Sequence, residues 1–220
     1  HLLERLEQLH RIGAALSRER DIHRLLENIL EAAKRLLGAD GGTLYRVTED
    51  GEALRFAIVR TDSLGLRLGG VSEEAPQFPD LPLRLPSGAL NDSLVAVHAA
   101  VHDRTINIAD AYCQQHFDFS GTRAFDARTG YRSQSFLTVP MKNHENELIG
   151  VLQLINATDP ATGQVRAFTA QDQRLAESLA SQAAIALSNR QLITQLETLF
   201  ESFVQLINLA IDEKSPYTGG

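Results

Sequence analysis

Apolar residues recur near the start of the chain with the spacing of an α-helix. In residues 1–17, four leucines and Gly13 follow one another at alternating intervals of four and three positions, which makes a narrow apolar seam. A seam of this width is typical of a helix that pairs with another helix. The leucines are Leu2, Leu6, Leu9 and Leu16.

A second helix is predicted to follow Asp21, whose side chain is a good N-cap, and to end at Gly38. Its apolar stripe is wider than the first seam, which indicates a helix buried against a larger surface. The stripe consists of Leu25, Leu26, Ile29, Ala33, Leu36 and Leu37.

Two pairs of segments have the pattern of β-strands. Residues 42–48 (“GTLYRVT”) and 53–60 (“ALRFAIVR”) flank an Asp-Gly pair, which favours a tight hairpin turn. Residues 135–143 (“SFLTVPMKN”) and 147–157 (“ELIGVLQLINA”) flank “HEN” and are apolar enough to be central strands. We therefore expect two antiparallel hairpins.

The segments between these hairpins are predicted to be shorter and less regular. Residues 63–88 are rich in Gly and Pro and are expected to cross the surface, with “LPLRL” as an edge strand. Residues 91–102 predict a short helix and residues 105–108 a short strand. The stretch from Phe117 to Gly130 is expected to be irregular, and it is unusual for its many aromatic and polar side chains.

The C-terminal part of the chain predicts one very long helix. Thr169 is its expected N-cap, with Asp172 three positions later in a capping-box arrangement. The helix would contain about 40 residues and extend for roughly 60 Å, more than a compact domain of this size needs. Polar Gln182 and Asn189 occupy two places of its heptad pattern, which favours a parallel homodimer. The apolar places are Leu175, Leu179, Ala186, Ile193, Leu196, Phe200, Phe203, Ile207 and Ala210.

These elements predict an α+β fold. An antiparallel sheet would carry helices on one face and a variable, pocket-forming layer on the other. The long N- and C-terminal helices would then serve as dimerisation helices.

Composition excludes several classes of protein. Hydrophobic residues make up 43% and charged residues 22% of the chain, which excludes disorder as the main state. The net charge is −7 and no run of Lys or Arg occurs, so no nucleic-acid partner is expected. No apolar run approaches the ~20 residues of a membrane span. The single Cys113 cannot form an internal disulfide, which favours a reducing, cytoplasmic setting. No base or orienting residue for a nucleophile is identified beside it, so a half-buried thiol is expected.

Gln153 is the first candidate site residue. It shares a strand face with Val151 and Ile155, so it is expected to be buried, where an amide needs partners for its donors and its acceptor. A hydrogen bond to neighbouring backbone is one interpretation. The other is that Gln153 lines a polar pocket.

A second group of candidates follows the irregular stretch. Asp126, Thr129 and Ser133 lie three and then four positions apart, with Arg132 beside them. Alone, this pattern fits a capped turn in which Gly130 takes a positive φ. Together with the flanking aromatic residues, it supplies the acceptor, donor and stacking groups that a small polar or heterocyclic ligand needs.

His98 and His102 lie four positions apart on the predicted helix and share one face, as a metal-binding pair would. The residues between them lack the Glu of a zinc-protease motif, and Asp103 is too generic as a third ligand. We therefore expect ordinary helix histidines and no metal site. Haem with His98, His102 or His116 as an axial ligand stays open, and a colourless protein would exclude it.

Four stretches in order resemble the landmarks of a GAF domain: “INIADAY”, “FDARTGYRSQSFLTVP”, “ELIGVLQLINA” and “AFTAQDQ”. The resemblance covers roughly residues 20–190. It is closest in pattern to the GAF domains of cyclic-nucleotide phosphodiesterases and adenylyl cyclases, and of bacterial signalling proteins. The fold that it implies, a sheet with helices behind and a ligand pocket in front, agrees with the pattern of elements.

The resemblance implies site residues as well. It places Asp126, Thr129, Ser133 and Gln153 at pocket-facing positions and assigns backbone contacts to Ala89 and Leu90. The nucleotide-binding members usually carry Glu in place of Gln153. A degenerate form of the family signature is present at Asn156, Phe168 and Asp172. Ala157 stands where those members have a Lys, which implies that Asp172 lacks a buried ion pair.

The last residues, “LINLAIDEKSPYTGG”, resemble the opening of an HD-GYP domain, a metal-dependent phosphohydrolase that typically acts on cyclic di-GMP. The expected organisation is a signalling helix at 1–20, a GAF domain at 21–190, a linker helix at 191–212 and the start of an HD-GYP domain at 213–220. The fragment itself is expected to lack catalysis, and its parent to be an HD-GYP enzyme.

The expected function is therefore regulatory. The GAF domain would bind a small molecule, with a cyclic nucleotide as one candidate, and binding would order the segment from Phe117 to Gly130 as a lid. The signal would pass through the long helices of a homodimer to the HD-GYP domain in cis. The alternative is a ligand-free module for dimerisation and relay, in which the pocket is collapsed around Phe117, Phe119 and Phe125.

Overall fold

The computed structural model describes residues 2–72 and 74–214 of the chain. Residues 1–187 form one compact unit and residues 188–220 a second, and each is described by itself. The helices are α1 (Leu2–Arg18), α2 (Ile22–Leu37), α3 (Val95–His102), α4 (Ser120–Thr129) and α5 (Ala170–Lys214), with a 3₁₀ turn at Ala111–Cys113. The strands are β1 (Ala39–Val47), β2 (Ala53–Thr61), β3 (Leu66–Gly69), β4 (Leu81–Pro82), β5 (Ile106–Ile108), β6 (Phe136–Lys142), β7 (Leu148–Thr158) and β8 (Val165–Arg166).

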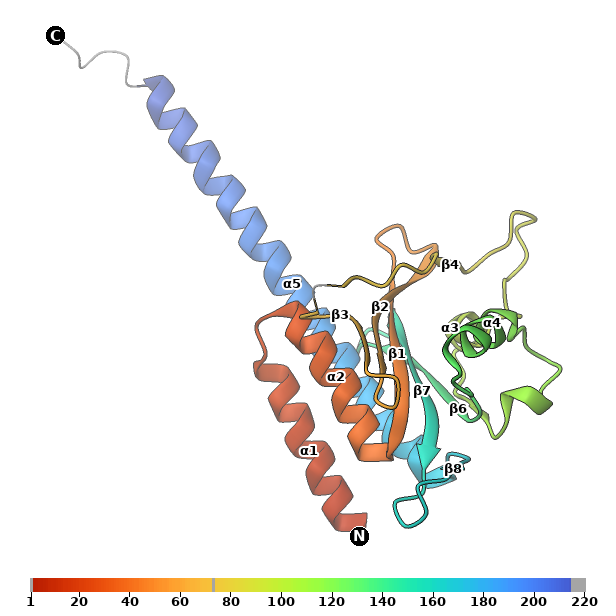
Figure 1. Ribbon diagram of the computed structural model, residues 1–220. Coiled ribbons are helices and arrows are strands. Elements are labelled where there is room, and N and C mark those ends of the chain that lie inside the picture. Colours follow the sequence, from red (N-terminus) through yellow and green to blue (C-terminus); the bar gives the residue numbers. More distant parts are fainter. Residues whose placement is uncertain (1, 73, 215–220) are drawn as a thin grey trace. The chain divides into compact units, whose positions relative to one another are not determined.

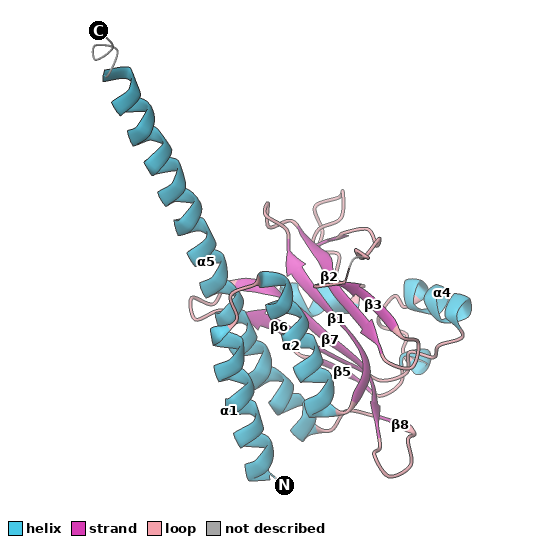
Figure 2. Ribbon diagram, turned by 60° about the vertical axis from the view of Figure 1, so that its left-hand side comes forward, coloured by secondary structure: helices cyan, strands magenta, loops and turns pink. Residues whose placement is uncertain are grey.

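The strands form one antiparallel sheet in the order β3-β2-β1-β7-β6-β5, with β4 paired to β2 and β8 paired to β7 (Figures 1 and 2). Both expected hairpins are confirmed, because β1 pairs with β2 and β6 pairs with β7. Strands β1 and β7 also pair with each other and so join the two hairpins at the centre of the sheet.

The two faces of the sheet are covered by different layers (Figure 1). On one face, β1, β6 and β7 contribute Leu44, Val139 and Leu152 to a large apolar core shared with α1, α2 and the start of α5. On the other face lie α3, α4 and the long connections, which bury two smaller apolar clusters. The expected α+β architecture, with helices behind the sheet and a separate layer in front, is confirmed.

Local signals position the helices behind the sheet. The carboxylate of Asp21 accepts the backbone N–H of Arg24 at 2.9 Å and begins α2, and Gly38 ends it with a left-handed φ of 66°. At the start of α5, Thr169 and Asp172 form the expected capping box. Asp172 Oδ2 accepts the Thr169 N–H at 2.9 Å, and Thr169 Oγ1 accepts the Asp172 N–H at 3.1 Å.

The apolar seam of α1 packs within its own chain. Leu9 and Leu16 are buried in the main core, and a side chain added at Gly13 would clash with Gln182 of α5. The other seam residue with a described side chain, Leu6, remains 47% exposed. The part of the seam that is buried is therefore used to attach α1 to the first unit, and a role of α1 in dimerisation stays a prediction.

The middle of the chain differs from the expected structure in three places. The stretch expected to be irregular contains helix α4, which ends at Gly130 with a φ of 73°. Strand β3 was not expected, and it extends the sheet beyond β2. The expected edge strand “LPLRL” is reduced to β4 and one isolated bridge between Arg84 and Leu90. All three elements are short, so their conformation depends on the partners they pack against.

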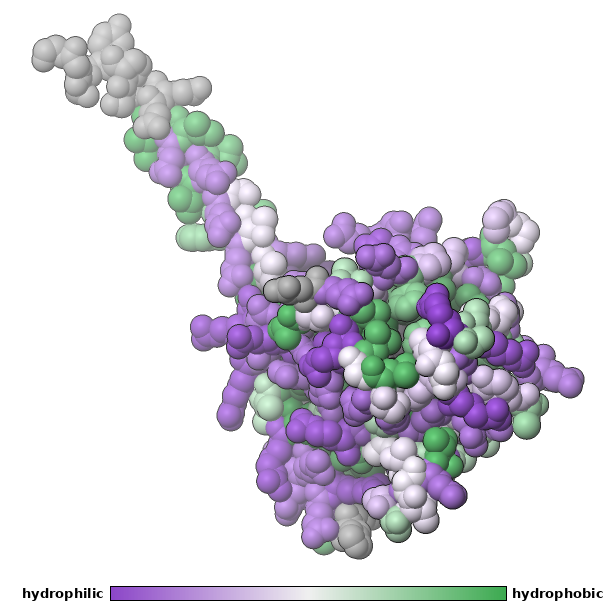
Figure 3. Space-filling model, in the orientation of Figure 1, coloured by the Kyte–Doolittle hydropathy of each residue, from purple (hydrophilic) through white to green (hydrophobic). Residues whose placement is uncertain are grey.

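The described part of the second unit is a single helical segment, the continuation of α5. Its side chains up to residue 211 are largely exposed and many are apolar, as Figure 3 shows for the helix surface. Its large exposed apolar residues are Leu192, Ile193, Leu196, Leu199, Phe200, Phe203, Val204, Leu206, Ile207, Leu209 and Ile211. Residues 206–214 of the HD-GYP-like stretch are helical, while its end, 215–220, lies outside the described residues.

Within residues 2–72 and 74–214, no helix combines the length and the hydropathy that crossing a bilayer requires.

Candidate functional site

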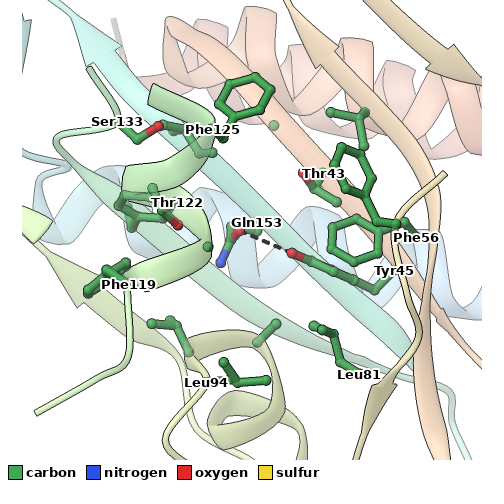
Figure 4. A pocket seen from close by; sticks show the side chains of 18 of the residues that line it. Thr43, Tyr45, Phe56, Leu81, Leu94, Phe119, Thr122, Phe125, Ser133 and Gln153 are labelled. Carbon is green, nitrogen blue, oxygen red and sulfur yellow. Dashed lines mark hydrogen bonds between the residues drawn. The ribbon is translucent and has the colours of Figure 1, made fainter. Parts of the chain in front are cut away.

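A cavity of about 320 Å³ lies between the front face of the sheet and the layer that contains α3 and α4 (Figure 4). Its floor comes from β1, β2, β6 and β7, and its opposite wall from the start of α3, from α4 and from the connection before β4. This volume is at the lower end of the range for sites that hold small organic ligands. The cavity is therefore large enough for a molecule of one or two fused rings.

A row of polar side chains runs across the front face of the sheet, and two of them, Thr43 and Gln153, line the cavity. Gln153 on β7 lies opposite Thr43 on β1 and opposite Thr138 on β6 in the strand register. Gln153 Nε2 donates to Thr138 Oγ1 at 3.0 Å, and the Tyr45 hydroxyl donates to Gln153 Oε1 at 3.3 Å. These two bonds use half of the hydrogen-bonding capacity of the amide, so it can still bind a ligand.

The expectation that Gln153 is buried is confirmed, since only 7% of it is exposed. The sequence left open whether Gln153 bonds to neighbouring backbone or lines a pocket. In the structure Gln153 lines the cavity, and its hydrogen-bond partners are the side chains of Tyr45 and Thr138.

Aromatic side chains form one end of the cavity. A β-bulge at Leu44/Tyr45 changes the register of β1 against β2 and brings Tyr45 opposite Phe56. Their ring centroids lie 4.7 Å apart, and Phe78 packs on Phe56 at 4.8 Å. Burial raises the pKa of the Tyr45 hydroxyl far above its usual range, so this group stays neutral and remains a hydrogen-bond donor.

Helix α4 forms the wall opposite the sheet. Phe119 immediately before it, and Thr122 and Phe125 within it, line the cavity (Figure 4). Phe119 packs on Phe136 of β6 with a centroid distance of 5.2 Å, which anchors the beginning of the helix to the sheet. Gly121 also lines the cavity, and a Cβ atom added there would meet no atom outside its own helix backbone and chain neighbours within 4 Å. The aromatic side chains of this stretch therefore pack against the sheet from the start of a helix.

The cavity has little charge. Among the described residues that line it, Asp118 is the one charged side chain. Its carboxylate accepts the backbone N–H of Ser120 at 2.9 Å, and hydrogen bonds from Ser120 lower its pKa, so it is ionised at neutral pH. Tyr131, another lining residue, donates its hydroxyl to Asp40 at 2.7 Å, and burial followed by this bond raises the pKa of Tyr131 well above its usual range.

The buried carboxylate of Asp126 is hydrogen-bonded to neighbouring residues and does not line the cavity. It accepts the Ser133 N–H at 2.8 Å, the Ser133 hydroxyl at 2.8 Å and the Tyr112 hydroxyl at 2.7 Å. Asp126 is not among the lining residues, whereas Ser133 is. These bonds tie α4 to Ser133, just before β6, and a ligand contact by Asp126 stays a prediction.

The remaining expected contact residues lie outside the cavity lining. Thr129 is exposed and donates its hydroxyl to the Phe125 carbonyl at 2.8 Å, within the same helix. Arg132 lies with its guanidinium 4.2 Å from the ring centre of Tyr112. Ala89 and Leu90 belong to a turn in which the Leu85 N–H donates to the Ala89 carbonyl. Of the seven expected positions, the structure brings Ser133 and Gln153 together at the cavity.

The signature residues have structural contacts. Asn156 adopts a left-handed φ of 58°, and its Oδ1 accepts the Gln134 N–H at 2.7 Å. Asp172 has an ion pair with Arg166 at 2.7 Å, which corrects the expectation that it lacks one. Burial raises the pKa of Asp172, but the hydrogen bonds from Thr169 and Arg166 outweigh it and lower the pKa on balance. Arg166 therefore supplies the cation that Ala157 cannot.

Cys113 is exposed, which corrects the expectation of a half-buried thiol.

Several residues that line the cavity were not expected from the sequence, among them Thr43 and Tyr45. The alternation of side-chain direction along β1 could have indicated them, because it puts both residues on the sheet face opposite Leu44. Phe78 lies in an irregular connection and Leu81 in the two-residue strand β4, and neither segment is long enough for periodicity to indicate side-chain direction.

A family model provides the decisive comparison. The GAF domain model matches residues 21–187, which is most of the chain. The chain belongs to the GAF domain family. Members with solved structures share the fold: the GAF domain of a phosphoenolpyruvate-protein phosphotransferase from Coxiella burnetii superimposes with a TM-score of 0.64 at 15% identity, over 88% of this chain and 98% of that chain.

Two curated relatives of this GAF domain are phosphodiesterases. “Dual 3',5'-cyclic-AMP and -GMP phosphodiesterase 11A” of Takifugu rubripes is 30% identical over 54% of this chain and 12% of its own length. “Dual 3',5'-cyclic-AMP and -GMP phosphodiesterase 11” of Drosophila melanogaster is 25% identical over 94% of this chain and 13% of its own length. The chain thus spans only a small part of these relatives.

Proposed function

We propose that this GAF domain is a sensor that binds a small, uncharged and mainly apolar molecule in the cavity. The observation that carries this proposal is the lining: aromatic and aliphatic side chains around one polar row centred on Gln153. A planar ring would pack against Tyr45, Phe56 and Phe125, while the free capacity of the Gln153 amide would select a ligand with one donor or acceptor group.

The charge of the lining argues against an anionic ligand. A cyclic phosphate needs cationic or N–H donors, and Lys, Arg and His are absent from the described lining residues. The first N–H of α4 would be a natural donor for a phosphate, but the ionised Asp118 already accepts the Ser120 N–H. A phosphate in that position would be repelled by this carboxylate.

A cyclic nucleotide remains the second candidate ligand. The support for it is the similarity to two proteins named as dual cyclic-AMP and cyclic-GMP phosphodiesterases. A ligand-free dimerisation and relay module is the alternative to both, and the open volume in front of Gln153 favours a ligand over it.

The output is proposed to pass through α5. This helix begins at the capping box shortly after β8 and continues to Lys214, within the HD-GYP-like stretch. Its exposed heptad positions, including Leu196, Phe200 and Phe203, fit a parallel homodimer with a second copy of the chain. In this proposal the parent protein is a cytoplasmic HD-GYP phosphodiesterase acting on cyclic di-GMP.

The binding proposal is tested with a variant that fills the cavity. Gly121→Phe adds a large side chain where the space is open, and Ala124→Phe adds the same side chain to an exposed position of α4 that does not line the cavity. The neutral dye N-phenyl-1-naphthylamine serves as an apolar probe, because its fluorescence rises when it leaves water. Native mass spectrometry of each purified protein reads any ligand that is already bound.

The wild type and Ala124→Phe are expected to bind the dye or to carry a discrete small mass, and Gly121→Phe to lose at least tenfold in dye affinity. Equal dye binding in all three proteins would refute the cavity as the site. Absence of both dye binding and added mass in the wild type would favour the relay module. A thermal shift caused by cyclic AMP or cyclic GMP, and abolished by Gly121→Phe, would support the second candidate.

A further inference from the structure

Helix α3 carries a cluster of three metal-ligating side chains outside the cavity. His98 and His102 lie on one face of the helix, and Asp92 comes from the connection that precedes it. One ring nitrogen of each histidine and one carboxylate oxygen of Asp92 lie within 4.8 Å of one another. The sequence offered Asp103 only as a generic third group and predicted no metal site; in the structure Asp103 pairs with Lys142, and the fold brings Asp92 to the histidines.

The contacts within the cluster resemble those of a metal site with its supporting bonds. His102 Nε2 lies 2.9 Å from Asp92 Oδ2, and the two imidazole centroids lie 4.4 Å apart. His98 Nδ1 lies 3.2 Å from the backbone carbonyl of Asp92. A ring N–H donated to a carbonyl in this way orients the imidazole and leaves the other nitrogen with a lone pair, as in many metal-binding histidines.

We propose that Asp92, His98 and His102 bind one first-row transition-metal dication, with Zn²⁺ as the preferred occupant. Two imidazole nitrogens and one carboxylate oxygen suit such a cation and do not suit Ca²⁺ or Mg²⁺, which take mainly oxygen ligands. The side chains of His102 and Asp92 are 36% and 46% exposed, so water completes the coordination. In the metal-bound state His102 is the neutral tautomer with its ring proton on Nδ1, and Nε2 and the Asp92 carboxylate bond the metal in place of each other.

The position of the cluster gives the metal a structural consequence. A bound dication would link the connection at Asp92 to the second turn of α3, and the residues between them, Leu94, Val95 and Ala96, line the cavity. His98 also packs edge-on against Phe117 at 5.1 Å, and Phe117 leads into the segment that begins α4. The metal would therefore hold one wall of the cavity in place.

The hydrogen bond between Asp92 and His102 is the simpler explanation of the cluster, so the test must detect the metal itself. The full chain, purified without a histidine tag and freed of metal, is titrated with Zn²⁺ by calorimetry and with Co²⁺ by visible absorption. The variants are His102→Gln and Asp92→Asn, and His144→Gln is the matched control in the exposed β6–β7 turn. Circular dichroism checks that each variant is folded.

The wild type and His144→Gln are expected to bind one Zn²⁺ per chain and to develop the same Co²⁺ band. Both cluster variants should bind about tenfold more weakly or worse, as the loss of a ligand implies. Absence of Zn²⁺ binding in the wild type would overturn the proposal. Unchanged affinity in a folded His102→Gln, or an equal loss in His144→Gln, would identify adventitious binding by surface histidines and would overturn it as well.

Discussion

Replacing Asp126 with Ala tests whether the most buried acid near the cavity is a structural residue. Asp126 is 4% exposed and accepts hydrogen bonds from the Ser133 N–H, the Ser133 hydroxyl and the Tyr112 hydroxyl. The substitution removes all three acceptor contacts at once. It leaves the Ser133 N–H buried, while the half-exposed Tyr112 can turn its hydroxyl to water.

The expected loss of stability follows from these contacts. A buried N–H without a partner costs about 1–3 kcal/mol, and the lost bond from the Ser133 hydroxyl to a charged group adds about 1.5 kcal/mol. With the Tyr112 bond counted as neutral, the free energy of unfolding falls by about 2.5–4.5 kcal/mol. For a domain of this length each kcal/mol corresponds to about 2–4 °C, so Tm falls by about 5–18 °C.

Thermal unfolding followed by circular dichroism measures this change, with Thr129→Ala as the control on the same helix. Thr129 is exposed, and its hydroxyl bonds only to the nearby backbone of Phe125 and Tyr131, so its replacement should move Tm by no more than about 2 °C. A decrease for Asp126→Ala as small as that of the control would refute the structural role. A folded, stable Asp126→Ala that failed to bind the dye would make Asp126 a ligand contact instead.

Three further changes probe the floor of the cavity, the start of α5 and its exposed apolar side. Gln153→Leu removes the acceptor of the buried Tyr45 hydroxyl and should lower the free energy of unfolding by about 1–2 kcal/mol, measured by urea denaturation, while weakening a polar ligand about tenfold. Because the pKa of Asp172 is lower in the folded protein than in the unfolded chain, its stabilisation is present above about pH 4 and is lost as the pH falls further. Asp172→Asn should therefore lower Tm at pH 7, and its Tm should decrease less than that of the wild type as the pH falls below about 4. Identical profiles of Tm against pH for the two proteins would contradict this. The double variant Leu196→Glu/Phe203→Glu should convert the proposed dimer to a monomer in light scattering, whereas Gln205→Glu should not; a wild-type monomer would exclude the dimer.

The elements that local patterns predicted are those whose signals lie within a few residues. The Asp21 cap, the Gly38 end and the capping box of Thr169 and Asp172 depend on contacts between neighbours in the sequence, and all are present. The two hairpins follow for the same reason, since their turns are short and their strands strongly apolar.

Helix α4 shows the limit of such patterns. Its sequence contains Gly121 and lacks a regular apolar stripe, which disfavours a helix in isolation. It is helical because Phe119 packs on the sheet and Asp126 bonds to Ser133, contacts that involve other elements. The site shows the same division: alternation along β7 put Gln153 on the front face, but the residues from irregular connections around it had no such signal.

The sequence by itself determined which strand faces are polar and where the long helices begin, because periodicity and capping act over a few residues. The family resemblance came from four motifs in order along the chain. The tertiary structure decided which polar groups satisfy one another. Asp126 bonds to Ser133 and Tyr112, Asp172 pairs with Arg166, and Asp92 reaches His102. These contacts join segments through turns and irregular connections whose paths depend on packing, so the candidate residues alone could not tell a ligand contact from a structural bond.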